Sequence, residues 1–238
     1  MNNSENKNLN KEYYEYKQKY KEANQADNYD QLFNLKSFRD YFNIKKIFGL
    51  LVAKFEQKAV GSLLLAVGHI DVILDVPCGT GKLIPYLLNK NINVIGIDAS
   101  AAMLSKIETR DKRLKLIEAE INKLPLDNDY VDLTICHRFL HRIPPENYEL
   151  ILKEIYKVSK EYAILYFAVK GPLTNLIQNI EKFMRIGNSR NIYYMTKTSV
   201  NNQIAAGGWD FVKDKFVLPM GISSGYLILV RKKRRLFE

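Results

Sequence analysis

A turn with two glycines, set between two apolar runs, carries residue types suited to binding a nucleoside. The run 72–75 ends in Asp75, Val76-Pro-Cys-Gly79-Thr-Gly81 follows, and the next run, 94–97, closes on Asp98. Glycines let the backbone pass close beneath a ligand with its N–H groups turned inward. A carboxylate at the end of the next strand suits the two hydroxyls of a ribose. The segment therefore predicts a strand, a ligand-binding loop, a helix and a second strand.

Two residues around this loop argue against a dinucleotide. In the dinucleotide fingerprint a third glycine opens the helix and the pyrophosphate sits on the helix N-terminus, but Ile84 stands at that place here. The carboxylate of Asp75 would repel a pyrophosphate and attract the ammonium and sulfonium groups of S-adenosylmethionine. We therefore expect S-adenosyl-L-methionine as cofactor, with S-adenosyl-L-homocysteine as product. The alternative, a purely structural turn, stays open.

Five segments together resemble the class I S-adenosylmethionine-dependent methyltransferases. They are residues 75–81, 94–104, 120–125, 130–136 and 139–143, in the order and spacing of that family. The resemblance implies an α/β fold, Rossmann-like and doubly wound. Its seven-stranded sheet would be mostly parallel with an antiparallel last strand, preceded by an N-terminal helical cap.

The resemblance also implies roles for the cofactor residues. Asp75 would balance the ammonium group, Asp98 would bind the ribose, and Met103 would cover the adenine, although a plain core role for Met103 is equally open. Glu120 would face the adenine amino group, with Glu118 as a competitor for that role. The full predicted set is Tyr29, Asp75, Pro77, Gly79, Thr80, Gly81, Asp98, Ala99, Met103, Glu120, Ile121 and Cys136.

Methyl transfer requires the nucleophile to be held in line with the breaking C–S bond, and a base only where the nucleophile holds its proton tightly. His137 and His141 follow the fourth predicted strand, where relatives place the substrate, and Tyr29 resembles a tyrosine that lies over the cofactor. These three are the candidate catalytic residues. Structural roles for both histidines, and helix packing for Tyr29, remain open.

Periodicity along the chain predicts one domain. Residues 1–10 are polar and Asn-rich and are expected to be disordered, and 11–58 show helical spacing, as a cap. Residues 59–238 would form the methyltransferase core, with a cap insertion at 171–200 that includes a helix at 173–186. Strands are predicted at 72–76, 94–98, 114–118, 131–136, 162–169, 210–218 and 226–231, and helices at 82–90, 101–107, 144–160 and 198–206.

Composition narrows the partners. The net charge is +10, but five positive charges lie in the run 231–235 and others alternate with acids, so nucleic acid is not expected as a partner. We expect no membrane span, no metal, a cytoplasmic location with both cysteines reduced, and a monomer or homodimer. The expected function is methylation of O, N or C of a small-molecule acceptor. An RNA or protein methyltransferase and a non-catalytic S-adenosylmethionine-binding regulator or subunit are the alternatives.

Overall fold

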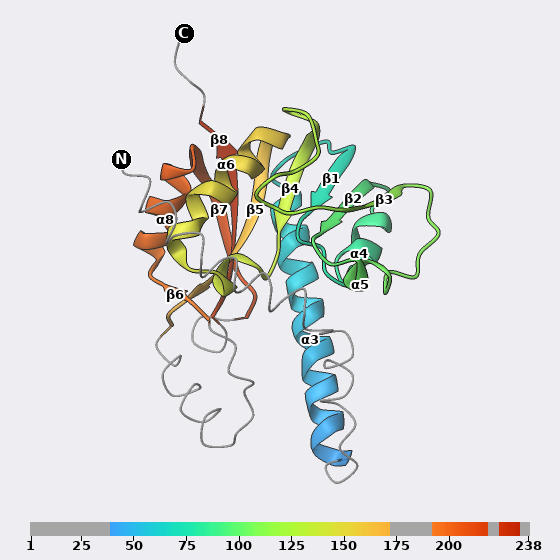
Figure 1. The fold of residues 1–238 in the computed structure, drawn as a ribbon. Helices are drawn as coiled ribbons and strands as arrows, with labels where there is room; N and C mark the ends of the chain where they lie inside the picture. The colour runs from blue at the N-terminus through green and yellow to red at the C-terminus, as the bar shows by residue number, and fades with distance from the viewer. Residues whose placement is uncertain (1–38, 172–191, 219–223, 234–238) are drawn as a thin grey trace.

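The computed structural model describes residues 39–171, 192–218 and 224–233 of the chain. One long helix, α3 (Arg39–Leu64), precedes the sheet, and shorter helices alternate with the strands (Figure 1). The strands are β1 (Val72–Asp75), β2 (Asn93–Asp98), β3 (Leu114–Glu118), β4 (Val131–Cys136), β5 (Ser159–Val169), β6 (Tyr194–Met195), β7 (Trp209–Phe216) and β8 (Gly225–Lys232). The remaining helices are α4 (Ile84–Leu88), α5 (Ala101–Leu104), α6 (Tyr148–Val158) and α8 (Lys197–Ala206), with the 3-10 turns η1 (Leu140–Arg142) and η2 (Pro145–Asn147).

The sheet has the order β3-β2-β1-β4-β5-β8-β7. Strands β1 to β5 pair in parallel, and β8 runs antiparallel to both of its neighbours, β5 and β7. The predicted doubly wound sheet with an antiparallel last strand is therefore confirmed. The structure adds an eighth strand, β6, whose two residues pair in parallel with Ala168 and Val169. A two-residue strand has no periodicity of its own, so the sequence does not predict it.

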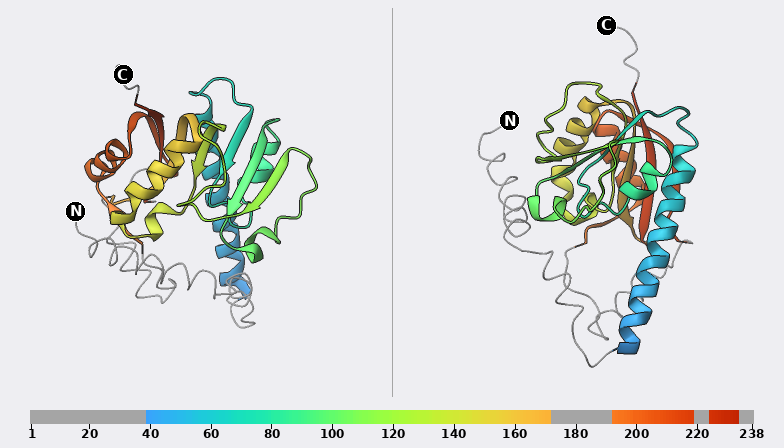
Figure 2. Two further views of the ribbon diagram at one scale, coloured as in Figure 1. Left: turned by 45° about the horizontal axis from the view of Figure 1, so that its top comes forward. Right: turned by 90° about the vertical axis from the view of Figure 1, so that its right-hand side faces the viewer.

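Helices cover both faces of the sheet. On one face α6 and α8 pack over residues such as Leu74, Ile97 and Leu165, and on the other α3 and α4 pack over Ile73, Leu133 and Ile164. Figure 2 (right) shows α3 and α6 on opposite sides of the sheet. Helix α6 packs there because its apolar residues recur at spacings of three and four, placing Tyr148, Ile151, Leu152 and Ile155 on one buried face.

Several element boundaries differ from the sequence prediction. The helical pattern does not stop at residue 58, because the apolar stripe continues through Ala59, Val60 and Leu63, all buried, to the end of α3. The predicted helix at 144–160 ends at Val158, since Ser159 already pairs with Val131 in the sheet. Helices α4 and α5 are shorter than predicted. The predicted helix at 173–186 and residues 1–38 lie outside the described residues.

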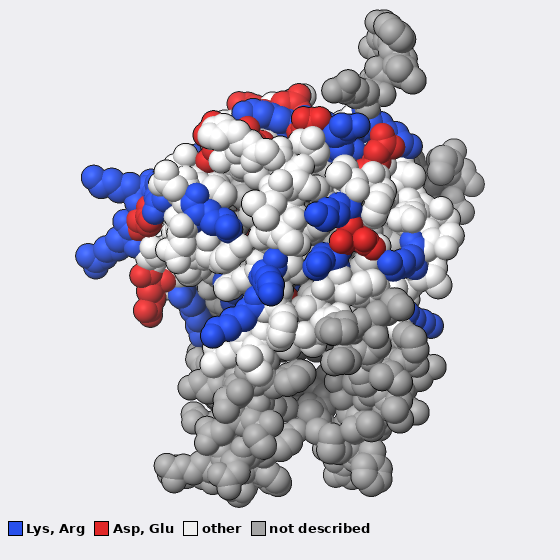
Figure 3. Space-filling view, turned by 180° about the vertical axis from the view of Figure 1, so that it is seen from behind, with Lys and Arg blue, Asp and Glu red and all other residues white. Residues whose placement is uncertain are grey.

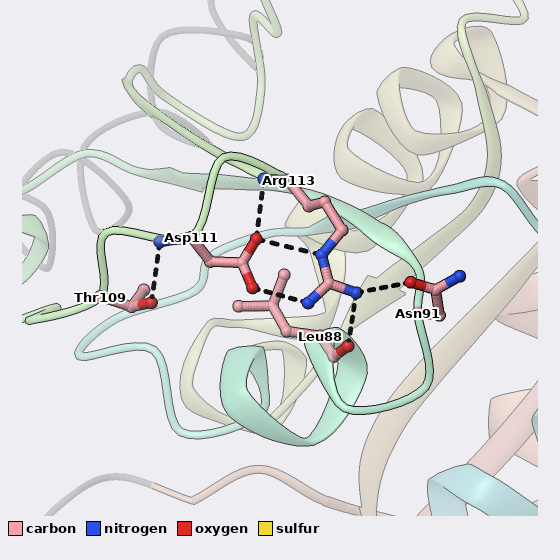
Figure 4. A network of polar contacts seen from close by, with 5 residues as sticks. All are labelled: Leu88, Asn91, Thr109, Asp111 and Arg113. Carbon is pink, nitrogen blue, oxygen red and sulfur yellow. Dashed lines mark hydrogen bonds and ion pairs between the residues drawn. The ribbon is translucent and has the colours of Figure 1, made fainter.

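An ion pair anchors the loop before β3 to the end of α4 (Figure 4). The guanidinium of Arg113 donates to both carboxylate oxygens of Asp111, at 3.0 and 2.6 Å, and to the carbonyl of Leu88 and the amide oxygen of Asn91, both at 2.9 Å. The backbone carbonyl of Arg113 accepts from the N–H of Val94 at 2.8 Å. The contacts fix the start of β3 against β2, and the same register pairs Glu118 with Asp98 at the opposite end.

The carboxyl ends of the parallel strands meet at one edge of the sheet, the lower edge in Figure 1, where β6 lies beside the end of β5. Such an edge is where open α/β sheets bind ligands. The N-terminal part of α3 extends beyond the same edge (Figures 1 and 2). None of the described helices combines the length and the apolar character needed to cross a bilayer.

Candidate functional site

The loop between β1 and α4, residues 76–81 and here called the glycine loop, has the backbone shape that its glycines allow. Gly79 and Gly81 have φ values of 55° and 73°, in the left-handed region that side chains disfavour. A Cβ on Gly81 would lie 3.0 Å from Cγ1 of Ile107. The N–H of Cys78 donates to the carbonyl of Ile97 at 2.8 Å, which ties the loop to β2. The peptide bond between Val76 and Pro77 is cis.

Asp98 organises the glycine loop from the end of β2. One carboxylate oxygen accepts from the N–H of Gly79 at 2.8 Å and the other from the N–H of Ser100 at 3.0 Å. The side chain is fully buried. The position predicted to bind a ribose is therefore preorganised by the loop itself.

Asp75 is a second buried carboxylate, at the end of β1. Burial, with the nearby charge of Asp98 as a smaller cause, raises the pKa of its carboxyl to about 8. Within the described part of the chain no hydrogen bond to this side chain is found. A buried carboxylate without a partner is costly, and a cationic ligand group would offset that cost. The position thus suits the ammonium predicted from the sequence.

Most of the other predicted cofactor residues lie near these carboxylates in the fold. Met103 is buried in the first turn of α5, whose N-cap, Ser100, accepts from its N–H at 3.3 Å. Glu120 and Ile121 are the second and third residues after β3. The N–H of Ala119, just before them, donates to the carbonyl of Asp98 and keeps this segment beside the end of β2. Cys136 ends β4 and is buried, as is Cys78 in the loop, and burial raises the pKa of both thiols. Tyr29 lies outside the described residues. Pro77 and Ala99 are half-buried, and Thr80 is exposed.

An ion pair with a buried carboxylate joins α3 to the segment that follows β4. Nε of Arg138 donates to Glu56 at 2.6 Å, and Nε2 of His137 lies 3.6 Å from the other oxygen of Glu56. The carboxylate of Glu56 is only 5% exposed. Burial raises its pKa and Arg138 opposes that rise. Arg138 has a φ of 53°, unusual for a residue other than glycine.

The second predicted histidine lies beside the first, against one tyrosine. The rings of His137 and His141 lie 5.2 and 5.1 Å from the ring of Tyr166. Burial lowers the pKa of both imidazoles to about 3, helped by the positive charges of Arg138 and Arg142. We call Glu56, His137, Arg138, His141, Arg142 and Tyr166 the β4 cluster. Both histidines are therefore neutral near pH 7. Their role as proton acceptors stays a prediction, and the low pKa values argue against it because they make the imidazoles weak bases.

Lys82 connects the β4 cluster to the glycine loop. It follows Gly81 directly, and its charge acts on both Glu56 and His137. The two groups of residues are thus neighbours. Three residues of the β4 cluster were not predicted from the sequence as site residues: Glu56, Arg142 and Tyr166. A signal existed for Glu56, because it lies on the apolar stripe of its helix, four residues after Val52 and four before Val60.

Comparisons with known proteins agree with this geometry. Residues 73–162 match a family described as methyltransferase domain. The chain is 31% identical over 127 residues to a malonyl-[acyl-carrier protein] O-methyltransferase of Pectobacterium atrosepticum, covering 51% of this chain and 49% of that protein. It spans about half the length of the first curated relatives it matches.

Two solved structures share the fold. The S-adenosylmethionine-bound magnesium protoporphyrin IX methyltransferase of Synechocystis PCC 6803 has a TM-score of 0.62 at 14% identity, over 88% of this chain and 92% of that one. The 1,6-didemethyltoxoflavin-N1-methyltransferase of Burkholderia thailandensis also gives 0.62, at 15% identity over 82% and 85%.

The fold and the site define a Rossmann-like methyltransferase domain. Residues 73–162 are similar to a methyltransferase domain, in agreement with the resemblance carried by the five sequence segments, and the chain shares the fold of S-adenosylmethionine-dependent methyltransferases of known structure. Across the described ranges no three His, Cys, Asp or Glu side chains gather in a way that could hold a metal ion.

Proposed function

We propose that the protein is a methyltransferase that binds S-adenosyl-L-methionine and methylates a small molecule. The observation that carries this proposal is the pair of buried carboxylates around the glycine loop. Asp75 offers a buried carboxyl group that a cationic ligand group would ionise, and Asp98 fixes the glycine loop through the N–H groups of Gly79 and Ser100. This arrangement fits a ligand that is cationic at one end and carries a nucleoside at the other.

In this proposal each residue binds or orients the two reactants. Asp75 holds the ammonium, Asp98 the ribose, Met103 covers the adenine, and Glu120 with the N–H of Ile121 reads its edge. The bound S-adenosylmethionine supplies an already activated sulfonium methyl group. The β4 cluster holds the acceptor in line with the C–S bond and excludes water. We also propose that the other predicted cofactor residues, Tyr29 among them, contact S-adenosylmethionine. The division of the chain into an N-terminal cap and a methyltransferase core is part of the same proposal.

A small molecule is the acceptor we favour. Similar proteins are named as methyltransferases of malonyl-[acyl-carrier protein], of magnesium protoporphyrin IX and of 1,6-didemethyltoxoflavin, and the last two acceptors are small molecules. The face of the molecule seen in Figure 3 carries its Lys and Arg side chains singly or in small groups, several beside Asp or Glu. Charge spread in this way gives little focus for a nucleic acid backbone. We therefore rank RNA or protein methylation, and a non-catalytic regulator, as second candidates.

Isothermal titration calorimetry tests the proposal. S-adenosylmethionine and S-adenosylhomocysteine should bind with a Kd in the micromolar range, on the order of −8 kcal/mol, whereas NAD should not bind. Binding of NAD in place of the other two would reject the proposal, as would binding of none of them.

The raised pKa of Asp75 predicts that binding depends on pH. Below about pH 8 the free protein holds a proton on Asp75, and a bound ammonium favours the carboxylate, so binding should release that proton. Affinity should rise by up to about tenfold per pH unit between pH 6 and 8 and then level off. Titrations at pH 7 in phosphate and in Tris should give different apparent enthalpies, and Asp75→Asn should remove the difference. Equal enthalpies for the unmodified protein would contradict the assignment.

A further inference from the structure

We infer that the methyl acceptor is a carboxylic acid, bound through its carboxylate by Arg142 beside His137 and His141 and methylated on oxygen. The inference rests on the proposed methyltransferase function and names the substrate class of the same site. The basis of the inference is a set of polar atoms in the β4 cluster for which the described fold provides no hydrogen-bond partner.

Three such atoms lie in one short segment after β4. They are Nε of Arg142, Nδ1 of His141 and Nε2 of His137, each buried and without a hydrogen bond, although Nε2 of His137 has an oxygen of Glu56 at 3.6 Å. His141 is 7% exposed and the side chain of His137 10%. Both imidazole rings pack against Tyr166, and the charge of Arg142 acts on both, so the three side chains are neighbours. Buried polar atoms left without hydrogen bonds lower stability, and a ligand that pairs with them offsets that loss.

The charge of the β4 cluster specifies an anion. The guanidinium of Arg138 is balanced by Glu56. The guanidinium of Arg142 has no carboxylate within ion-pair distance in the described part of the chain. Arg142 therefore adds a positive charge to the cluster that none of the described carboxylates pairs with. A carboxylate carries one negative charge and matches the fork of a guanidinium, whereas a phosphate monoester carries about −1.5 to −2.

The lack of a strong base in the β4 cluster agrees with this acceptor. The pKa of about 3 for His137 and His141 makes both too weak to take a proton from an alcohol or an ammonium near neutral pH. A carboxylate arrives already deprotonated. One of its oxygens forms the new bond to the methyl carbon while the C–S bond breaks, and the electron pair of that bond stays on sulfur. The products are a methyl ester and neutral S-adenosylhomocysteine, and no proton is exchanged.

The test uses S-adenosylmethionine labelled in its methyl group, with straight-chain, dicarboxylic and aromatic acids as probes. The alcohol and the amine of each carbon skeleton serve as matched probes. Label should enter acids only, and mild base should release it as methanol, as for a methyl ester. Label in alcohols or amines would overturn the inference. Absence of label in every acid would do so too, if calorimetry shows that S-adenosylhomocysteine binds. Failure of that binding would instead reject the proposed function.

Arg142→Gln provides a second test. The KM for the labelled acid should rise about 10- to 100-fold, the range expected for a lost charged hydrogen bond, while the Kd for S-adenosylhomocysteine stays unchanged. The melting temperature should not fall, because the replaced group has no partner in the described fold. Arg110→Gln, at an exposed arginine, is the matched control and should alter none of the three. An unchanged KM, or a lower melting temperature, would show that Arg142 has a structural role instead.

Discussion

Asp98→Ala is expected to weaken S-adenosylmethionine binding by about a hundredfold or more. The carboxylate accepts from the N–H groups of Gly79 and Ser100 at 2.8 and 3.0 Å, so its loss frees the glycine loop as well as removing the proposed contacts to the ribose. Hydrogen bonds to a charged group contribute about 1.5–3 kcal/mol each, and two of them account for this factor. Titration calorimetry with S-adenosylmethionine measures it directly.

Asp127→Ala, at an exposed acid beyond β3, is the matched control and should leave the affinity unchanged. Asp98→Asn should give an intermediate loss, because an amide oxygen can still accept from one of the two N–H groups. Circular dichroism should show a folded variant, since removal of Asp98 also relieves the repulsion on Asp75. An affinity for Asp98→Ala within a factor of about three of the original would contradict the ribose assignment.

Arg138→Ala should lower the free energy of unfolding by about 3 kcal/mol at pH 8, because it leaves the buried carboxylate of Glu56 without its partner. The loss should shrink as the pH falls. Burial already raises the pKa of Glu56, and removal of Arg138 raises it further, so the carboxyl binds a proton in the folded variant at low pH. Protonation of Glu56 therefore stabilises the folded variant fully at pH values below the pKa of Glu56 in the unfolded chain. This stabilisation is lost as the pH rises through the pKa of Glu56 in the folded state. Urea unfolding at pH 5 and pH 8 measures the effect.

Two further variants separate the causes. In Arg138→Asn the new side chain tolerates the left-handed backbone at this position but carries no charge. The variant should therefore lose nearly as much stability as Arg138→Ala. Lys153→Ala breaks an exposed ion pair with Glu149 and should cost about 0.5 kcal/mol or less. A loss for Arg138→Ala as small as that of Lys153→Ala would mean that the contact to Glu56 contributes little.

The sequence predicts those parts of the fold in which a local pattern and the tertiary environment agree. Strands 114–118 and 131–136 match β3 and β4 at both ends, because apolar runs there are bounded by polar residues. The helix predicted to reach residue 160 is wrong at its end. Its pattern would continue, but Ser159 is drawn into β5, and its hydroxyl lies 2.7 Å from that of Thr134. A contact with a residue 25 positions away leaves no trace in local periodicity.

The candidate site divides in the same way. Asp75, Gly79, Gly81 and Asp98 were predicted because one short segment holds the whole motif, and the structure brings them together. The β4 cluster was not predicted as a unit. Glu56 comes from α3 and Tyr166 from β5, and Arg142 resembles any surface arginine until the lack of a partner for its buried Nε is seen. Whether a buried polar atom lacks a hydrogen-bond partner can be recognised only once the three-dimensional structure is known.

The insertion of β8 between β5 and β7 has a consequence for how the chain is made. Every residue of β8 from Gly225 to Val230 is buried, yet the strand follows all other described strands in sequence. During synthesis, the edge of β5 therefore stays unpaired, with its apolar residues uncovered, until residues 225–232 have left the ribosome. An open edge next to apolar side chains invites association with other chains. A nascent chain stalled before Gly225 should therefore bind chaperones that the released chain, with β8 paired to β5, no longer needs.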